Sequence, residues 1–366
     1  MNDLAIALRK RLHEIPERSG AECQTRAMLI AFLKSHTTLE VKDMGTWLYA
    51  AHREGDGLPG VMLRADMDAV SGPNGAAFHG CGHDGHCANL AALALACEGR
   101  TFGKNLFFLF QPAEETGAGA RECLALFERE RIDAVYGMHN LPGFAKGTVM
   151  VRGGTFACAS KGLTLRFTGR QCHAAYPETG LNPAYAMAAL VTELKALTGP
   201  AQGELVLCTL VHMRVGERAF GVSAGDGELA LTLRAERLEA LDALQERIVN
   251  HARELCREQG LGLETAEDDV FPDTRCREAD VKRFCASAAA AGLRVERLEK
   301  PMRWSEDFGW YLRNRPGVFF GIGAGEEHAA LHTPEYEYDD ALIGTAVQAF
   351  LAAIESAEFA SREHVK

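Results

Sequence analysis

The first 150 residues alternate short apolar runs with longer stretches of helical periodicity. The short runs predict strands and the longer stretches predict helices, in a strand–helix–strand order. This order is typical of a mostly parallel sheet with helices on both faces, where ligands bind beyond the carboxyl ends of the strands. Polar residues that directly follow strands are therefore the first candidates for a binding or catalytic site. The predicted strands are 61–64, 105–110 and 134–138, and the predicted helices are 84–97 and 118–129.

The sequence pattern changes at about Ala159, where the predicted strands become longer and alternate apolar with polar residues. Two long amphipathic helices separate these strands in a β-α-β-β-α-β order, which predicts an inserted α+β sandwich ending near Phe271. The strand–helix alternation of the first 150 residues then resumes. The strands of the insert are 163–168, 204–215 and 228–234, its helices are 182–197 and 238–258, and the later elements are a helix at 277–292, a strand at 318–323 and a helix at 339–355.

The pattern predicts an α/β protein with a mixed, mostly parallel sheet flanked by helices and interrupted by the insert. We expect residues 1–159 and 272–366 to form one domain and residues 160–271 to form the other. The length of 366 residues agrees with two domains. With 47% hydrophobic and 24% charged residues, the composition is that of a folded globular chain. The net charge of -11 argues against a broad phosphate-binding surface, so nucleic acid is not an expected partner.

The N-terminal stretch predicts a helix rather than a targeting segment. Leu4, Leu8, Leu12 and Ile15 share one helical face among charged residues, and the apolar core of a signal peptide is missing. The longest apolar run, 88–97, is about half of the roughly 20 residues that a membrane span needs. Eleven cysteines without a CxxC pair indicate neither a disulfide framework nor a zinc ribbon. We therefore expect a cytoplasmic protein with no membrane partner.

The densest cluster of reactive side chains is the run HGCGHDGH at residues 79–86, just before a predicted helix. Zinc and similar metals accept imidazole, thiolate and carboxylate ligands together, and the glycines allow alternate side chains to reach one point. We expect Cys81 to be a metal-bound thiolate, with His79 or His86 as the next candidate ligand. The alternative is a flexible loop with surface histidines and one buried cysteine.

Three further groups follow predicted strands. Glu114 and Glu115 end the run FQPAEE, and adjacent carboxylates diverge, so that one could bind a metal while the other acts as a general base. A solvated helix start is the alternative for this pair. His139 follows the strand at 134–138. Taken alone, a histidine in this position favours a structural role over a role as metal ligand. Asp66 and Asp68 end another strand and could orient metal-binding groups or cap a turn.

The order and spacing of these motifs, from Leu12 to Asp340, resemble a known family. LHEIPE, RADMDA, HGCGHDGH, FQPAEE, GMHN, GRQCHAAYP with GLNP, SEDF and LHTPEY are similar to the hippurate hydrolase and indole-acetyl-amino acid hydrolase group of metal-dependent amidohydrolases. That group belongs to the aminoacylase and carboxypeptidase G superfamily of peptidases. The resemblance implies a di-zinc exopeptidase-like fold and hydrolysis of N-acyl amino acids or related small amides. A dipeptidase or diacid deacylase, or a non-catalytic metabolite-binding relative, is the alternative.

The resemblance also implies the roles of individual residues. Two divalent metal ions are implied, zinc being favoured by the mixed thiolate and imidazole set, with manganese and cobalt as alternatives. Glu114 is implied as the general base that takes a proton from the attacking water and passes it to the leaving amine. The implied metal ligands are Cys81, His83, Glu115, His139 and His332.

The inserted domain is implied to be a lid that forms a homodimer. His173, in GRQCHAAYP, is implied to donate to the oxyanion of the reacting amide, often in the partner subunit's site. Its alternative role is to cap the loop before Pro177. Asn182 of GLNP and Arg234 are implied to bind the substrate, Arg234 through a carboxylate, with a surface salt bridge as its alternative role.

Two segments depart from the family pattern, and both concern the substrate. Between RADMDA and HGCGHDGH the family carries a longer stretch with an acidic residue, whereas this chain has only VSGPNGAAF at residues 70–78. In the insert, the family's Asn-Val-Ile-Pro run is replaced by GVSA at residues 221–224. The choice of acyl group and amino acid is therefore not predicted by the resemblance.

Overall fold

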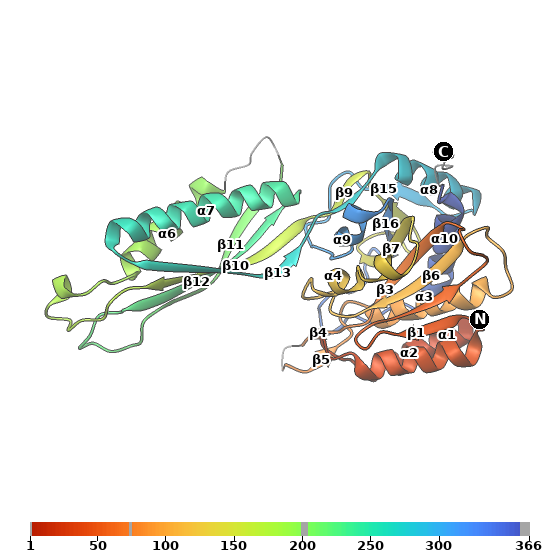
Figure 1. Ribbon diagram of the computed structural model, residues 1–366, viewed down its shortest axis with the longest axis horizontal. Coiled ribbons are helices and arrows are strands. Elements are labelled where there is room, and N and C mark those ends of the chain that lie inside the picture. Colours follow the sequence, from red (N-terminus) through yellow and green to blue (C-terminus); the bar gives the residue numbers. More distant parts are fainter. Residues whose placement is uncertain (1, 73–74, 199–203, 359–366) are drawn as a thin grey trace. The chain divides into compact units, whose positions relative to one another are not determined.

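The computed structural model describes residues 2–72, 75–198 and 204–358, and it divides into two compact units (Figure 1). The first unit is discontinuous in sequence and comprises Met1–Phe156, Thr274–Pro301 and Glu306–Lys366. The second comprises Ala157–Asp273 and the short segment Met302–Ser305.

An eight-stranded sheet forms the centre of the first unit, in the order β1-β2-β6-β3-β7-β16-β8-β15. Its four pairs β6–β3, β3–β7, β7–β16 and β8–β15 are parallel, whereas β1–β2, β2–β6 and β16–β8 are antiparallel. The predicted fold class, a mixed and mostly parallel sheet with an additional sandwich domain, is confirmed. The strands are β1 (Glu40–Asp43), β2 (Leu48–His52), β3 (Gly60–Asp66), β6 (Asn105–Gln111), β7 (Ala134–Pro142), β8 (Val149–Val151), β15 (Val295–Arg297) and β16 (Gly317–Gly325).

The central strands β3 and β6 are buried along their whole length, as expected for strands covered on both faces. Two small pairs accompany the main sheet, β4 (Val70–Ser71) with β5 (Ala77–Phe78) and β9 (Gly154–Ala157) with β14 (Thr274–Cys276). The helices of this unit are α1 (Asn2–His13), α2 (Cys23–His36), α3 (His83–Cys97), α4 (Gly119–Cys123), α5 (Leu126–Arg129), α8 (Glu278–Ala290), α9 (Gly309–Asn314) and α10 (Leu342–Ser356).

Helix α3 is the central helix of the unit, and its alanine and leucine side chains are almost all buried. It packs against α1, α10 and strand β3, which fixes the direction in which its first residue, His83, points. Two predictions about helices were wrong in part. The helix predicted over 118–129 is broken into α4 and α5, and Leu4, predicted on the apolar face of α1, is 41% exposed while Leu8 and Leu12 are buried.

The second unit is an antiparallel four-stranded sheet in the order β11-β12-β10-β13, packed against two helices. Leucines from alternate positions of the strands meet the apolar faces of the helices in one core. The predicted β-α-β-β-α-β order is confirmed, although the first helix begins two residues later than predicted. The elements are β10 (Ala159–Thr168), the 3₁₀ turn Pro177–Thr179, α6 (Ala184–Leu197), β11 (Val206–Val215), β12 (Asp226–Ala235), α7 (Leu238–Gln259) and β13 (Gly262–Phe271).

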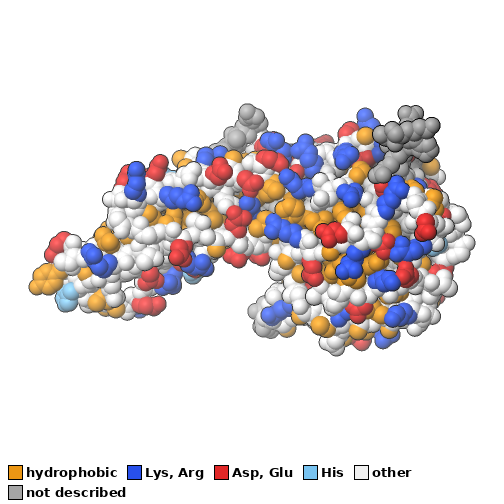
Figure 2. Space-filling view, viewed as in Figure 1, with side chains coloured by type: hydrophobic (Ala, Val, Ile, Leu, Met, Phe, Trp, Pro, Cys, Tyr) orange, Lys and Arg blue, Asp and Glu red, His pale blue; other side chains and the backbone are white. Residues whose placement is uncertain are grey.

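Acidic and basic side chains are interspersed over the face shown in Figure 2, and neither sign forms a continuous patch there. Among the described helices, none has both the length and the apolar character required to cross a membrane.

Candidate metal centre

The run HGCGHDGH forms a buried turn that leads directly into α3. Cys81 is 5% exposed and His83 is fully buried, so the alternative of a flexible surface loop is wrong. Gly82 adopts a left-handed backbone with φ of 88°, and a side chain there would collide with Tyr336 and Asn140. A glycine is therefore required at this position to turn the chain between the two reactive residues.

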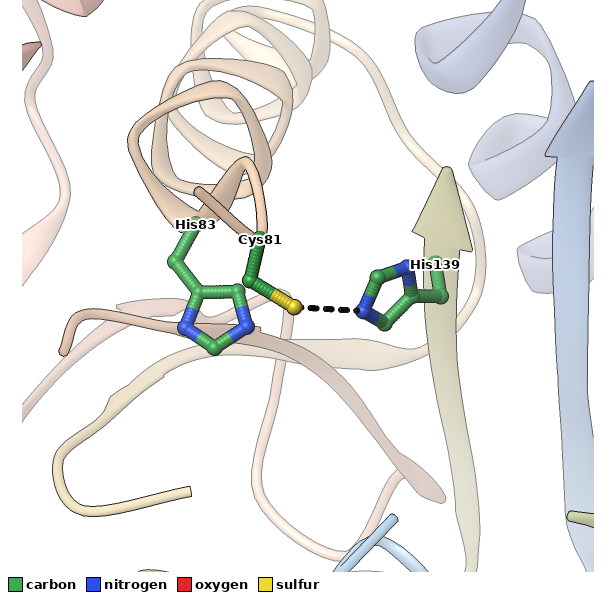
Figure 3. A group of neighbouring side chains, drawn as sticks. All are labelled: Cys81, His83 and His139. Carbon is green, nitrogen blue, oxygen red and sulfur yellow. Dashed lines mark hydrogen bonds between the residues drawn. The ribbon is translucent and has the colours of Figure 1, made fainter. Parts of the chain in front are cut away.

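The sulfur of Cys81 lies between two imidazole nitrogens. Cys81 Sγ is 3.3 Å from His139 Nε2, at the carboxyl half of β7, and 3.4 Å from His332 Nε2, in the loop after β16. Figure 3 shows Cys81 and His83 reaching from the start of α3 toward His139 on the neighbouring strand. Ligand atoms bound to one tetrahedral zinc ion, with Zn–S about 2.3 Å and Zn–N about 2.0–2.1 Å, lie roughly 3.5 Å apart. The observed separations fit a shared metal.

Glu115 brings a carboxylate to the same place. Its Oε1 atom lies 3.7 Å from His83 Nε2 and 3.7 Å from His332 Nε2. Both Glu115 Oε1 and His83 Nε2 are buried without a hydrogen-bond partner. Buried polar atoms normally have partners, and two orphaned atoms of ligand type facing one another are satisfied by a cation. The residues present therefore fit the two-metal centre that the resemblance implies.

Hydrogen bonds at Nδ1 fix the ring orientations of His83 and His139. His83 Nδ1 faces only acceptors, the backbone oxygen of Asp68 at 2.9 Å and its Oδ1 at 3.2 Å. His139 Nδ1 faces the backbone oxygen of Asn140 at 2.8 Å. In both cases Nδ1 is the donor, so Nε2 carries the lone pair that a metal would bind. Burial also lowers the pKa of His139 well below its ordinary value, which keeps it in the neutral form that binds metals.

Asp68 ties several parts of the site together. It accepts hydrogen bonds from Ser19 Oγ at 2.6 Å and from the Glu115 backbone N–H at 3.0 Å, in addition to its contact with His83. These contacts place Asp68 against both His83 and Glu115, and its orienting role stays a prediction.

Glu114 is 6% exposed, and one of its carboxylate oxygens lies within 4.8 Å of a carboxylate oxygen of Glu115 and a ring nitrogen of His83. Burial raises the pKa of its carboxyl well above the ordinary value, and the charges of Glu306 and Glu115 raise it further. The preceding Ala113 has a φ of 50°, a left-handed conformation that is strained for alanine, and its N–H donates to Glu22 Oε1 at 2.8 Å. No helix begins at the pair, because α4 starts only at Gly119, so the alternative of a solvated helix start is wrong.

A buried ion-pair network lies next to Glu114. Arg64 is almost fully enclosed and contacts Asp66 at 2.7 Å, Asp307 at 2.9 Å and Glu306 at 3.1 Å. The backbone N–H of Asp307 donates to Glu114 Oε1 at 3.3 Å. Sequence reasoning assigned no role to Arg64, Glu306 or Asp307, although all three stand within the quoted runs RADMDA and SEDF.

His332 has a left-handed backbone with φ of 65°, and its N–H donates to the oxygen of Gly80 at 2.8 Å. This bond joins the loop after β16 to the turn that carries Cys81. His79 and His86, the reserve candidates for ligands, are otherwise engaged. His79 Nε2 contacts the backbone oxygen of Leu12 at 3.1 Å, and His86 lies between Asp66 and Asn140.

Three of the predicted site residues lie in the second unit. His173 is exposed, and its Nδ1 accepts the Ala175 N–H at 3.1 Å. Asn182 Oδ1 accepts the N–H of Ala184 at 3.0 Å, at the start of α6.

Arg234 is the third of these residues. Its Nη1 atom donates to the Arg303 backbone oxygen at 2.6 Å and to Ser305 Oγ at 2.7 Å, and within the described part of the chain it forms no ion pair. Burial lowers the pKa of Arg234.

A metal-ligand cluster beside a buried carboxylate, at the carboxyl ends of parallel strands, defines a metal-dependent hydrolase that acts on amide bonds. The chain belongs to peptidase family M20/M25/M40, whose model matches residues 62–356. The resemblance stated from the motifs is thereby confirmed at the level of the family.

Relatives of known activity and solved structures agree with this assignment. The chain is 27% identical over 353 residues to an N-acetyl-L-cysteine deacetylase of Bacillus subtilis, with 92% of this chain and 84% of the relative covered. It is 26% identical over 359 residues to an N-acetyldiaminopimelate deacetylase of Exiguobacterium sibiricum, with 93% and 96% covered. The fold matches the YXEP protein of Bacillus subtilis, described as a dinuclear metal binding peptidase, with a TM-score of 0.81 at 24% identity and 97% of each chain covered.

Proposed function

We propose that the protein hydrolyses the amide bond of N-acyl amino acids with two divalent metal ions, releasing a carboxylic acid and an amino acid. The observation that carries the proposal is the meeting of Cys81, His83, His139, Glu115 and His332 beside a buried Glu114. The two deacetylases that resemble the chain over more than 90% of its length act on N-acetyl amino acids, which supports this class of substrate.

The five ligand residues hold the metals in this proposal, and bound metals lower the pKa of water and polarise the carbonyl oxygen of the amide. The mixed sulfur, nitrogen and oxygen donor set favours zinc, and manganese or cobalt are the alternatives. Burial raises the pKa of the Cys81 thiol in the absence of a cation, and binding of a metal would reverse this effect.

Glu114 is the general base in this proposal. Its carboxylate receives the proton that water loses on attack and delivers it to the nitrogen of the leaving amine. Burial raises the pKa of Glu114, which makes its carboxylate a stronger base for the proton that water loses. The hydrogen bond from the Asp307 N–H holds one carboxylate oxygen, which leaves the other directed toward the reaction.

The first test is chelator-sensitive hydrolysis. Metal-loaded protein is incubated with acetyl-, benzoyl- and longer acyl-amino acids and with dipeptides, and the products are identified by mass spectrometry. We expect amino acid release from the acyl-amino acids that stops when the metals are removed. Hydrolysis of dipeptides alone would favour the dipeptidase alternative, and tight binding of a metabolite without turnover would favour a binding protein.

The second test separates the base from the ligands. Glu114→Gln should lower kcat by a factor of about 10² to 10⁴ while the metal content stays at the wild-type level. Glu115→Gln is the matched comparison, since it should lower the metal content as well. Loss of bound metal in Glu114→Gln would contradict the assignment of Glu114 as base.

We further propose that the second unit forms a homodimer and carries His173 as an oxyanion donor, with Asn182 and Arg234 as substrate contacts. Strand β11 supports this, because it is an edge of its sheet and exposes three large apolar side chains, Leu210 (38%), Val211 (60%) and Met213 (43%). Exposed edges of this kind favour pairing with a second copy. All eleven cysteines are free, which supports a reducing compartment such as the cytoplasm.

A further inference from the structure

A cavity of about 410 Å³ opens beside the metal ligands within the first unit. Glu115 and His332 form part of its wall, so a substrate bound at the metals extends into this space. The rest of the wall comes from Arg18, Ser19, Thr116 and the segment Ala69–Ser71. Arg18 is the one basic side chain with a permanent charge among these residues.

The position of Arg18 is fixed through the backbone. Arg18 forms an isolated parallel bridge with Ala69, and the Ala69 N–H donates to the oxygen of Glu17 at 2.8 Å. The adjacent Ser19 donates to Asp68, the residue that orients His83. The backbone of Arg18 is thus attached to the same framework that holds the metal ligands.

The guanidinium of Arg18 is uncommitted within the described part of the chain, where it forms no hydrogen bond and no ion pair. The guanidinium lies beside the segment 70–78, since a Cβ atom built on Gly75 would be 3.6 Å from Arg18 Nη2. Residues 70–78 contain no acidic residue, and no described acidic side chain pairs with Arg18. The cavity wall therefore presents an unpaired positive charge.

We propose that Arg18 determines substrate specificity by binding a carboxylate of the substrate that is not part of the reacting amide. The proposal rests on the proposed function. Arginine matches the two oxygens of a carboxylate with two parallel N–H donors, and the hydroxyl of Ser71 offers a further donor along the same wall. The preferred substrate is then an anionic one, with the extra carboxylate either on the acyl chain or on the side chain of the amino acid.

Two pairs of nearly isosteric substrates distinguish these sources. N-succinyl-alanine against N-butanoyl-alanine tests a carboxylate on the acyl chain, and N-acetyl-aspartate against N-acetyl-asparagine tests one on the amino acid. We expect kcat/KM to favour the anionic member in one pair. Arg18→Ala should lower that anionic-to-neutral ratio at least about tenfold, and Arg18→Glu should lower it further. Added salt should lower the wild-type ratio, because the guanidinium is exposed and its charge is screened.

Arg11→Ala is the matched control, because Arg11 is an exposed arginine of α1 outside this cavity. It should keep the wild-type ratio in both pairs. Ratios for Arg18→Ala within about twofold of wild type in both pairs would overturn the proposal even if both neutral substrates are hydrolysed. If no acyl-amino acid is hydrolysed, the proposed function fails, and calorimetric titration of the metal-loaded protein still tests Arg18. Glutarate should then bind more tightly than butyrate to the wild type, and equal affinities in the wild type and Arg18→Ala would reject the proposal.

Discussion

His83 Nδ1 lies 3.2 Å from Asp68 Oδ1, and this contact decides which nitrogen of the ring is available to a metal. The opposite nitrogen, Nε2, is buried without a hydrogen-bond partner and lies 3.7 Å from the equally unpartnered Glu115 Oε1. Because Asp68 also accepts the N–H of Glu115, one carboxylate positions two ligands that are 32 residues apart in sequence.

Replacing Asp68 should therefore weaken metal binding without removing a ligand. Asp68→Ala is expected to lower the affinity for zinc by a factor of about 10 to 100, because His83 loses its fixed tautomer and the turn at Glu115 loses its anchor. Zinc titration of the metal-free protein measures this. Asp56→Ala, at an exposed loop position, is the control and should bind zinc like the wild type. An unchanged affinity in Asp68→Ala would show that the aspartate only caps the turn.

Cys81→Ser should lower metal content and turnover together, because its sulfur is the group shared by His139 and His332. Cys97→Ser is the matched control. Cys97 is a buried cysteine at the end of α3, and its replacement should keep the full metal content. Oxidation should inactivate the metal-free protein faster than the metal-loaded one, because coordination shields the sulfur. Normal turnover and a full metal complement in Cys81→Ser would make His79 or His86 the next candidate.

Arg64 and Arg53 provide a contrast between a buried and an exposed ion pair. Arg64→Met leaves three buried carboxylates without their cation and should lower the free energy of unfolding by about 3 to 5 kcal/mol. Arg53→Met breaks pairs with Glu40 and Glu130 but is 42% exposed, so we expect a loss of about 0 to 1 kcal/mol. Urea unfolding of the metal-free variants measures both. Equal losses would show that the buried network adds nothing to stability.

The homodimer can be tested on the exposed edge of β11. Val211→Glu places a charge among Leu210 and Met213 and should convert the dimer to a monomer in light scattering after size exclusion. Leu4→Glu is the control, since Leu4 is an exposed apolar residue of α1, in the first unit. A monomeric wild type would remove the support for dimerisation and for an oxyanion donor supplied by the partner.

The sequence predicted strands β3, β6, β7 and β16 of the main sheet and most helices, because β3 and β6 are continuous apolar runs and α7 has a regular helical period. It did not predict β1, β2, β8, β15 or α2. The break between α4 and α5 was missed because the apolar pattern continues across it while the backbone turns. The candidate ligand residues were predicted from the resemblance of the motifs to the family, because His139 and the glutamate pair, taken alone, were also compatible with structural roles. Arg64, Glu306 and Asp307 were missed because charged residues in a sequence give no sign of burial, and only the packing of distant segments shows that they face one another.

The N–H of His332 bonded to Gly80 joins residues that are 252 positions apart in a chain of 366. Ribosomal synthesis delivers the turn of Cys81 and His83 early, and it delivers His332 only after the complete second unit has been made. The nascent chain consequently displays a thiol and an imidazole that have no finished cation site for most of its synthesis. Under the proposed ligand assignment, truncated chains that end before residue 332 lack one ligand, and we expect the complete cation site to form only late in synthesis.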